Sequence, residues 1–182
     1  MKTLILNGSP RKNGDTVSLI KKLTDILDGE HKIINAYFSN ISPCIDCRYC
    51  WRNNGCSIDD EMSEIYDYIK ECDNIIMASP VYFSQPTGKL LDVCSRFQRY
   101  YTLKEFQGVA PEIKPKKGAI ILVGGGDGQP ESAYSTLKTI MQHINVTDIF
   151  RLTGSFNTNN VSAEDDNTAL IGINEIAKFM NK

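Results

Sequence analysis

The loop from Asn7 to Thr16 carries the first residues whose types and spacing could do chemistry. It joins a short apolar run to a segment with helical spacing. Backbone N–H groups at a helix N-terminus would therefore face it, and the helix dipole there favours an anion. Gly8 and Gly14 permit close approach of the backbone to a ligand. The side chains that could hold an anion are those of Ser9, Arg11, Asn13 and Thr16. A phosphate monoester fits this loop, and an Asn-Gly turn followed by Thr16 as a helix cap is the alternative without a ligand.

The loop matches neither of the two common nucleotide-binding fingerprints. It is not a Walker loop, because no Gly-Lys-Ser/Thr follows it. No complete G-x-G-x-x-G pattern occurs here or around Gly124 to Gly128. If this loop binds a phosphate group, it therefore belongs to another class of phosphate-binding loop.

A second group of chemistry-bearing residues is the cysteine segment, which we define as residues 42–58. Its thiols are those of Cys44, Cys47, Cys50 and Cys56. The first three form two successive C-x-x-C steps, which aim sulfurs at different corners of one iron-sulfur cubane. Gly55 can let the chain fold back so that the fourth sulfur reaches the remaining iron. The spacing predicts a [4Fe-4S] cluster.

Two other interpretations of the cysteine segment stay open. The thiols could be free or reversibly oxidised, as in reductases that carry such a loop without metal. Zinc competes less well, because a structural tetrathiolate site usually pairs two C-x-x-C knuckles across a long spacer. Cys72 and Cys94 lie outside the segment, in a strand approach and a helical pattern, where buried inert thiols are expected.

Size and composition favour one ordinary globular domain covering residues 1–182, with the cysteine segment as an insertion. The chain is 41% hydrophobic and 23% charged, with a net charge of -2 and a pI near 5.7. A surface that binds nucleic acid needs a basic face, so we expect no nucleic-acid partner. We also expect no membrane association and, without an export signal, a cytoplasmic protein whose cysteines stay reduced.

Strands and helices alternate along the chain, which predicts an α/β protein. The expected strands lie at 4–6, 32–38, 74–79, 118–123 and 148–152. The expected helices lie at 16–28, 60–70, 86–97, 132–144 and 167–180. This order favours a doubly wound five-stranded parallel sheet with helices on both faces, whose ligands bind beyond the carboxyl ends of the strands. Three loops end there, at residues 7–16, 79–86 and 123–131.

Several of these loop residues match a known family. The segments Asn7-Gly8-Ser9-Pro10-Arg11, Ser79-Pro80-Val81-Tyr82-Phe83 and Pro86-Thr87-Gly88-Lys89 resemble the NADPH-dependent FMN reductase and iron-sulfur flavoprotein group. Val123-Gly124-Gly125-Gly126 falls where such proteins carry another flavin loop, so the resemblance spans roughly residues 1–130. It implies a flavodoxin-like sheet with strand order 2-1-3-4-5. One departure is Ser95, where an acidic residue is expected before Arg96.

The resemblance also implies a cofactor and its binding residues. The FMN phosphate would be held by Ser9, Arg11, Asn13 and Thr16. The ribityl chain and flavin ring would be lined by Pro80, Val81, Tyr82, Phe83, Gly125 and Gly126. The group's compact cysteine motif implies a [4Fe-4S] cluster held by the four thiols of the cysteine segment. No catalytic side chain is expected, because the flavin itself performs the transfer.

Three functions follow as hypotheses. The leading one is an FMN-dependent oxidoreductase that passes electrons between a [4Fe-4S] cluster, FMN and an external donor or acceptor, a small molecule or a protein such as ferredoxin. The second is a metal-free reductase of FMN or quinones that uses NAD(P)H. The third is a non-enzymatic electron carrier like flavodoxin. A homodimer or higher homo-oligomer is expected, because the resemblance places the flavin near a subunit interface.

Overall fold

The apolar run after Met1 forms strand β1 (Lys2–Asn7), which lies inside a parallel sheet. Leu4, Ile5 and Leu6 are buried, and they contribute to the cores on both faces of the sheet. A computed structural model describes residues 1–182. β1 pairs in parallel with β2 (Glu30–Asn35) on one side and with β3 (Asn74–Tyr82) on the other. A strand inside a parallel sheet is covered on both faces, so the apolar residues of β1 are contiguous in the sequence rather than alternating.

The predicted parallel α/β sheet is confirmed, but its main strand order is β2-β1-β3-β5-β6 rather than the predicted 2-1-3-4-5, because a short strand, β4, lies off this path. The remaining parallel strands of this order are β5 (Lys116–Val123) and β6 (Val146–Ile149). Two short strands are added, so the sheet has seven strands rather than the predicted five. β4 (Gln85–Pro86) pairs antiparallel with β3, and β7 (Thr153–Ser155) pairs in parallel with β5.

The prediction of a single fifth strand at residues 148–152 is wrong because the chain leaves the ladder there. β6 pairs with the start of β5 and ends at Ile149, and β7 resumes alongside the end of β5 at Thr153. Between them, Phe150 packs against Phe179, and Arg151 forms an ion pair with Glu175. These residues therefore serve the contact with the last helix.

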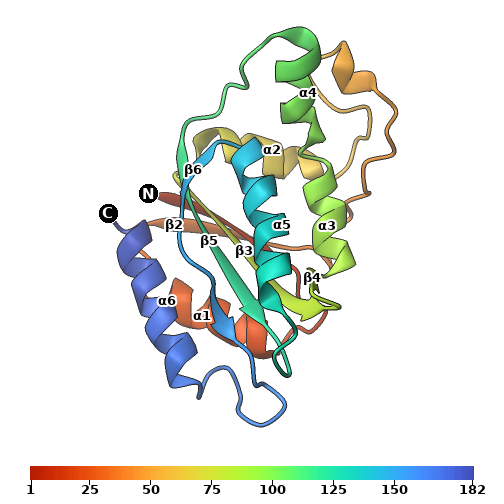
Figure 1. The fold of residues 1–182 in the computed structure, drawn as a ribbon. Coiled ribbons are helices and arrows are strands. Elements are labelled where there is room, and N and C mark those ends of the chain that lie inside the picture. The colour runs from red at the N-terminus through yellow and green to blue at the C-terminus, as the bar shows by residue number, and fades with distance from the viewer.

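Helices cover both faces of the sheet (Figure 1). One face is covered by α1 (Asp15–Thr24) and α6 (Asn167–Met180), and the other by α2 (Met62–Glu71), α3 (Gly88–Ser95) and α5 (Pro130–His143). α6 has the bounds predicted for it, and Asp166 caps it by accepting from the backbone N–H groups of Thr168 and Ala169. None of the helices combines the length and the apolar composition that a membrane-spanning helix needs.

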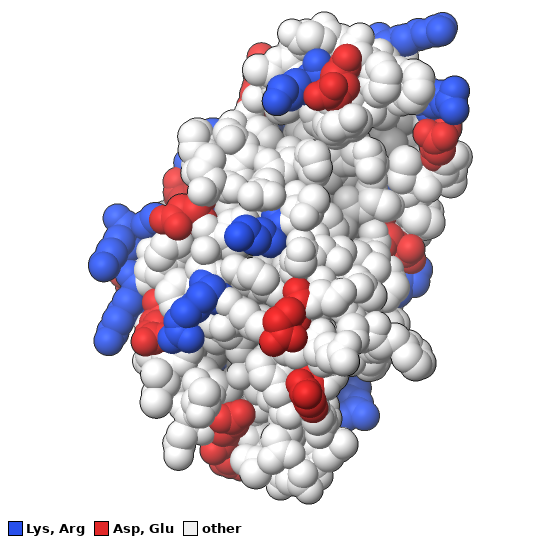
Figure 2. Space-filling model, viewed as in Figure 1, with Lys and Arg blue, Asp and Glu red and all other residues white.

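The third predicted helix is shorter than expected and is followed by one that the sequence pattern did not predict. α3 ends at Ser95, and α4 (Gln98–Gln107) begins three residues later. α4 contacts the short 3-10 helix η1 (Tyr49–Trp51) inside the cysteine segment. Figure 1 shows α3 rising from the carboxyl edge of the sheet towards α4 and the cysteine segment. On the face shown in Figure 2, acidic and basic side chains are interspersed.

Candidate functional site

Loops that follow separate strands meet at the carboxyl edge of the sheet and enclose a cavity of about 260 Å³. We call it the loop cavity. Its lining comes from the loop after β1, the end of β3, the loop after β5 and the loop after β7. The lining residues are Ser9, Pro10, Arg11, Gly14, Asp15, Thr16, Pro80, Val81, Tyr82, Val123, Gly124, Gly125, Thr158 and Asn159. A doubly wound sheet places ligands at this edge.

The N-terminus of α1 opens into the loop cavity without a side-chain cap. Gly14 is the capping residue, and the first backbone bond of the helix runs from Ser18 to Gly14 at 2.9 Å. The N–H groups of Asp15, Thr16 and Val17 donate to no protein acceptor. Thr16 lies inside the helix rather than at its cap, so the prediction that Thr16 caps this helix is wrong. Free N–H groups and the positive end of the helix dipole suit an anion.

The loop after β1 is fixed by its own side chains and by α3. Asn7 accepts from the Ser9 N–H at 2.9 Å, and the Ser9 hydroxyl accepts from the Arg11 N–H at 3.2 Å. Ser9 is buried, whereas Arg11 is exposed and free to turn towards a ligand. The hydroxyl of Thr87 donates to the Gly8 carbonyl at 2.8 Å. The loop is therefore preorganised by contacts that leave its cation available.

A second wall of the loop cavity comes from two loops that bind each other. The N–H and the hydroxyl of Thr158 both donate to the Gly124 carbonyl, at 3.1 and 3.2 Å. Gly125 and Asn159 pack closely, because a Cβ at Gly125 would lie 2.5 Å from Oδ1 of Asn159 and would require that side chain to shift. The glycine loop thus brings backbone close to the cavity while Asn159 fills the space that a side chain would take.

The structure brings most of the predicted flavin residues together. Those lining the loop cavity are Ser9, Arg11, Thr16, Pro80, Val81, Tyr82 and Gly125. Asn13 and Gly126 are exposed outside its lining, and Phe83 is fully exposed at the tip of the β3–β4 hairpin with φ of 51°. Thr158 and Asn159 also line the loop cavity, although the sequence did not lead us to predict them. The rule that ligands bind at the carboxyl ends could have indicated them, since they follow the last strand.

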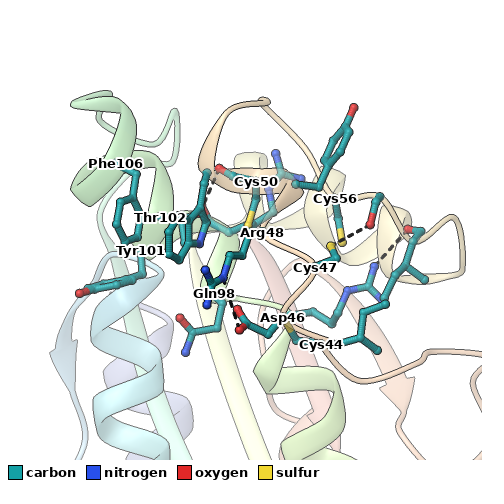
Figure 3. A pocket seen from close by; sticks show the side chains of 17 residues that line it. Cys44, Asp46, Cys47, Arg48, Cys50, Cys56, Gln98, Tyr101, Thr102 and Phe106 are labelled. Atoms are coloured by element: carbon teal, nitrogen blue, oxygen red, sulfur yellow. Dashed lines mark hydrogen bonds and ion pairs between the residues drawn. The ribbon is translucent and has the colours of Figure 1, made fainter.

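The four thiols of the cysteine segment line one further cavity, of about 190 Å³ (Figure 3). Arg48, Arg96 and Arg99 also line it, together with Trp51 and Phe106. The rings of Trp51 and Phe106 stack with their centroids 4.1 Å apart. No three of the sulfur atoms gather closely enough to hold one metal ion. The four thiols therefore share a cavity but form no site for a single metal ion.

The cysteines differ in their chemistry. The hydroxyl of Ser57 lies 3.0 Å from Sγ of Cys47, and this hydrogen bond, with the Tyr49 N–H, lowers the pKa of the Cys47 thiol. Burial raises the pKa of Cys72 to about 11 and that of Cys94 to about 12. Both thiols are buried, which agrees with the expectation that they are inert.

The fold and the loop cavity define a flavodoxin-like α/β protein in which the first strand leads, through a loop, to a helix with free N–H groups at its start. The chain belongs to the NADPH-dependent FMN reductase family, whose model matches residues 1–160.

Several curated relatives are named iron-sulfur flavoproteins. One, from Methanocaldococcus jannaschii, is 36% identical over 93 residues, which are 50% of this chain and 48% of that protein. Another, from Archaeoglobus fulgidus, is 28% identical over 145 residues, which are 78% of this chain and 63% of that protein. The matched parts thus span about half to two thirds of these relatives.

Solved structures show the fold. An NAD(P)H:quinone oxidoreductase from Methanothermobacter marburgensis has a TM-score of 0.71 at 16% identity, covering 100% of this chain and 94% of that one. An FMN-dependent NADH-azoreductase from Bacillus anthracis, solved in complex with FMN, has a TM-score of 0.63 at 16% identity. It covers 100% of this chain and 99% of its own.

Proposed function

We propose that this chain is an FMN-dependent oxidoreductase whose cofactor binds in the loop cavity. The observation that carries the proposal is the uncapped N-terminus of α1, whose free N–H groups lie in that cavity beside an exposed arginine. This is the arrangement expected for a phosphate group, and the chain belongs to a family of FMN reductases. Bound FMN would supply the hydride and electron transfer.

In this proposal the residues of the loop cavity divide between the two ends of the cofactor. Ser9, Arg11, Asn13 and Thr16 hold the phosphate together with the N–H groups of α1. The flavin end is lined by Pro80, Val81, Tyr82, Phe83, Gly125 and Gly126. Thr158 and Asn159 are additions from the structure, and the polar atoms of Asn159 face Gly125. The protein's part is binding and orientation.

Comparison of FMN with riboflavin tests the phosphate site, because riboflavin lacks the phosphate. The variant Arg11→Ala should weaken FMN binding by about tenfold and leave riboflavin binding unchanged. Arg151→Ala, which removes an exposed arginine paired with Glu175 of α6, is the matched control and should bind FMN like the unaltered protein. Equal loss of affinity for the two ligands in Arg11→Ala would show that the phosphate lies elsewhere.

NAD(P)H is the proposed electron donor, and it distinguishes an enzyme from a carrier. The family is named for NADPH-dependent FMN reduction. A relative from Bacillus subtilis is named a putative NAD(P)H-dependent FMN-containing oxidoreductase. The FMN-loaded protein should oxidise NAD(P)H when a quinone or excess FMN is present. Binding of FMN without NAD(P)H oxidation would instead support the flavodoxin-like carrier, for which a protein such as ferredoxin is a candidate partner.

We further propose that the cysteine segment holds a [4Fe-4S] cluster through Cys44, Cys47, Cys50 and Cys56. The support is a donor set of four thiols around one cavity and the names of relatives such as the iron-sulfur flavoprotein of Methanosarcina thermophila. Such a cluster would supply one-electron transfer. Anaerobic purification followed by iron and sulfide analysis tests it. Absence of both iron and sulfide from a protein that binds FMN would favour the metal-free reductase.

A homodimer is also proposed. Its support is the fully exposed Phe83 beside the half-exposed Tyr82, both on the β3–β4 hairpin next to the loop cavity. Exposed aromatic side chains of this kind are enriched at interfaces. Light scattering coupled to size-exclusion chromatography should give twice the mass of one chain, and a single-chain mass for the FMN-loaded protein would contradict the proposal.

A further inference from the structure

The two ends of the cysteine segment meet at a single side chain. Arg96 caps the C-terminus of α3, and its Nη1 donates to the carbonyl oxygen of Ser42 at 2.9 Å. Its Nη2 donates to the carbonyl oxygen of Ile58 at 3.2 Å. Ser42 is the first residue of the segment and Ile58 is the last. One planar guanidinium therefore closes a loop of seventeen residues at its base.

Asp60 completes this junction. Its Oδ2 accepts from Nη1 of Arg96 at 2.8 Å and from the N–H of Ser42 at 2.9 Å, while its Oδ1 accepts from the N–H of Met62 at 3.0 Å. The two side chains are only 1% and 5% exposed. Removing one partner of such a pair would leave an uncompensated charge in the interior, so the junction is strongly constrained.

The departure at Ser95 lies beside this junction. The acidic residue expected before Arg96 is absent, but Asp60 supplies the carboxylate from beyond the cysteine segment. The Ser95 hydroxyl instead accepts from the N–H of Cys44 at 2.9 Å. Both residues at the end of α3 are thus committed to the cysteine segment.

We propose that Arg96, paired with Asp60, is the positioning residue of the cysteine segment and determines how fully it is loaded with iron. The inference rests on the proposed cluster. The four thiols line one cavity, and each would bind a different iron of the cluster. Fixing both ends of the segment removes conformational freedom that cluster binding would otherwise lose.

A second anchor holds the middle of the segment but not its ends. The carbonyl oxygen of Cys50 accepts from Nε2 of Gln107 at 2.9 Å and from the hydroxyl of Thr102 at 3.3 Å, both on α4. These contacts keep the segment against α4. They do not reach Ser42 or Ile58, whose carbonyl oxygens both accept from Arg96.

The position of Arg96 also relates the segment to the loop cavity. α3 has eight residues and is about 12 Å long. Thr87, just before it, binds the loop after β1, whereas Ser95 and Arg96 at its other end bind the cysteine segment. A single short helix therefore sets the distance between the two proposed redox sites. Substitution of Arg96 should release the cysteine segment from α3 and leave the loop after β1 in place.

Cleavage by trypsin measures the mobility of the cysteine segment without any metal. Trypsin cleaves after lysine and arginine, and Arg48 and Arg52 are the only basic residues of the segment. The variant Arg96→Met should raise cleavage at these two residues about tenfold or more under native conditions. After anaerobic reconstitution, the unaltered protein should hold about four irons per bound FMN, and the variant should hold a small fraction of that ratio. FMN binding should stay unchanged.

Three further variants sharpen the test. Arg151→Met removes an exposed arginine and should change neither cleavage nor iron content. Arg96→Lys keeps the charge, but one ammonium cannot reproduce the guanidinium fork, so its values should lie between the two extremes. Asp60→Asn removes the partner's charge with little change of shape, so it provides a second disruption of the pair if Arg96→Met does not fold.

The outcomes separate the two proposals. If neither the unaltered protein nor its variants bind iron, the cluster is refuted. Faster cleavage of the variants would then still support the role of Arg96 in the segment. Unchanged cleavage together with an unchanged iron-to-FMN ratio in Arg96→Met would overturn the inference while leaving the cluster in place. Full restoration of both values by Arg96→Lys would show that charge alone suffices, and would overturn the bridging role.

Discussion

The hydroxyl of Thr87 donates a hydrogen bond of 2.8 Å to the carbonyl oxygen of Gly8, which joins the start of α3 to the loop after β1. Thr87 is fully buried. Gly8 packs so closely against α3 that an added Cβ would lie 2.9 Å from Cβ of Leu90. The Thr87 N–H in turn donates to the Ser79 hydroxyl at 3.0 Å. Thr87 therefore ties the loop after β1 to Ser79 of β3, beside the loop cavity.

The variant Thr87→Val should lower the free energy of unfolding by about 1–3 kcal/mol, because it leaves the buried Gly8 carbonyl without a donor. Urea denaturation followed by circular dichroism measures this change. Thr139→Val is the matched control, since Thr139 donates to a backbone carbonyl of its own helix while exposed to water. The control should change stability by less than about 0.5 kcal/mol. Equal effects of the two substitutions would contradict the structural role of Thr87.

The packing of Gly125 against Asn159 gives a prediction about cofactor affinity. In Gly125→Ala the new Cβ would meet the amide group of Asn159, so the loop cavity should be distorted and FMN should bind more weakly. Gly126→Ala should have a smaller effect, because a Cβ there meets nothing within 4 Å. Fluorescence titration with FMN measures both affinities.

A double variant identifies the cause of that loss. Asn159→Ala removes the amide atoms that the new Cβ would meet, so the pair Gly125→Ala and Asn159→Ala should bind FMN better than Gly125→Ala alone. Additive losses in the double variant would show that the two residues act independently.

Much of the fold could be predicted from local patterns. The contiguous apolar run of β1 and the predicted bounds of α6 agree with the structure, because burial on both faces and a periodic apolar stripe leave clear traces in sequence. α4 could not be found in this way. Its buried residues are Tyr100, Thr102 and Leu103, and its face towards η1 is specified by contacts such as the stack of Trp51 on Phe106.

The candidate sites show the same limit. The loop after β1 could be predicted because a phosphate site is built locally, from a strand end and the following helix. Asn159 packs against Gly125, which lies 34 positions earlier in the chain, and Arg96 pairs with Asp60, which lies 36 positions earlier. Local sequence patterns therefore do not indicate either contact. Spacing indicated the cysteines as a group, whereas the residues that hold their segment come from α3 and α4.

Cys47 should be the most reactive cysteine of the metal-free protein. Its pKa is lowered by the hydrogen bond from Ser57 and by the Tyr49 N–H, so more of it is thiolate at neutral pH. The variant Ser57→Ala should raise that pKa and slow alkylation of Cys47 severalfold at pH 7. Mass spectrometry after brief exposure to iodoacetamide measures each site. Modification of buried Cys72 or Cys94 at a similar rate in folded protein would contradict the prediction.

Asp60 gives a prediction about stability and pH. Burial alone would raise the pKa of this carboxyl, but the Arg96 guanidinium and the N–H groups of Ser42 and Met62 bring it below its ordinary value of 3.8. The native state therefore binds the proton less readily than the unfolded chain does. The stabilisation is complete above pH ~4 and is lost as the pH falls through the lowered native pKa.

The variant Asp60→Asn should therefore be less stable at pH 7 by about 3–5 kcal/mol, because it leaves Arg96 charged and buried without a carboxylate. The difference from the unaltered protein should shrink as the pH falls below ~4, where the unaltered protein loses the same interaction. Guanidinium denaturation at pH 7, 5 and 3 measures it. Asp67→Asn, in an exposed pair with Lys70, should cost less than about 0.5 kcal/mol at every pH. A difference between Asp60→Asn and the unaltered protein that stays constant from pH 7 to pH 3 would mean that the charge of Asp60 does not stabilise this junction.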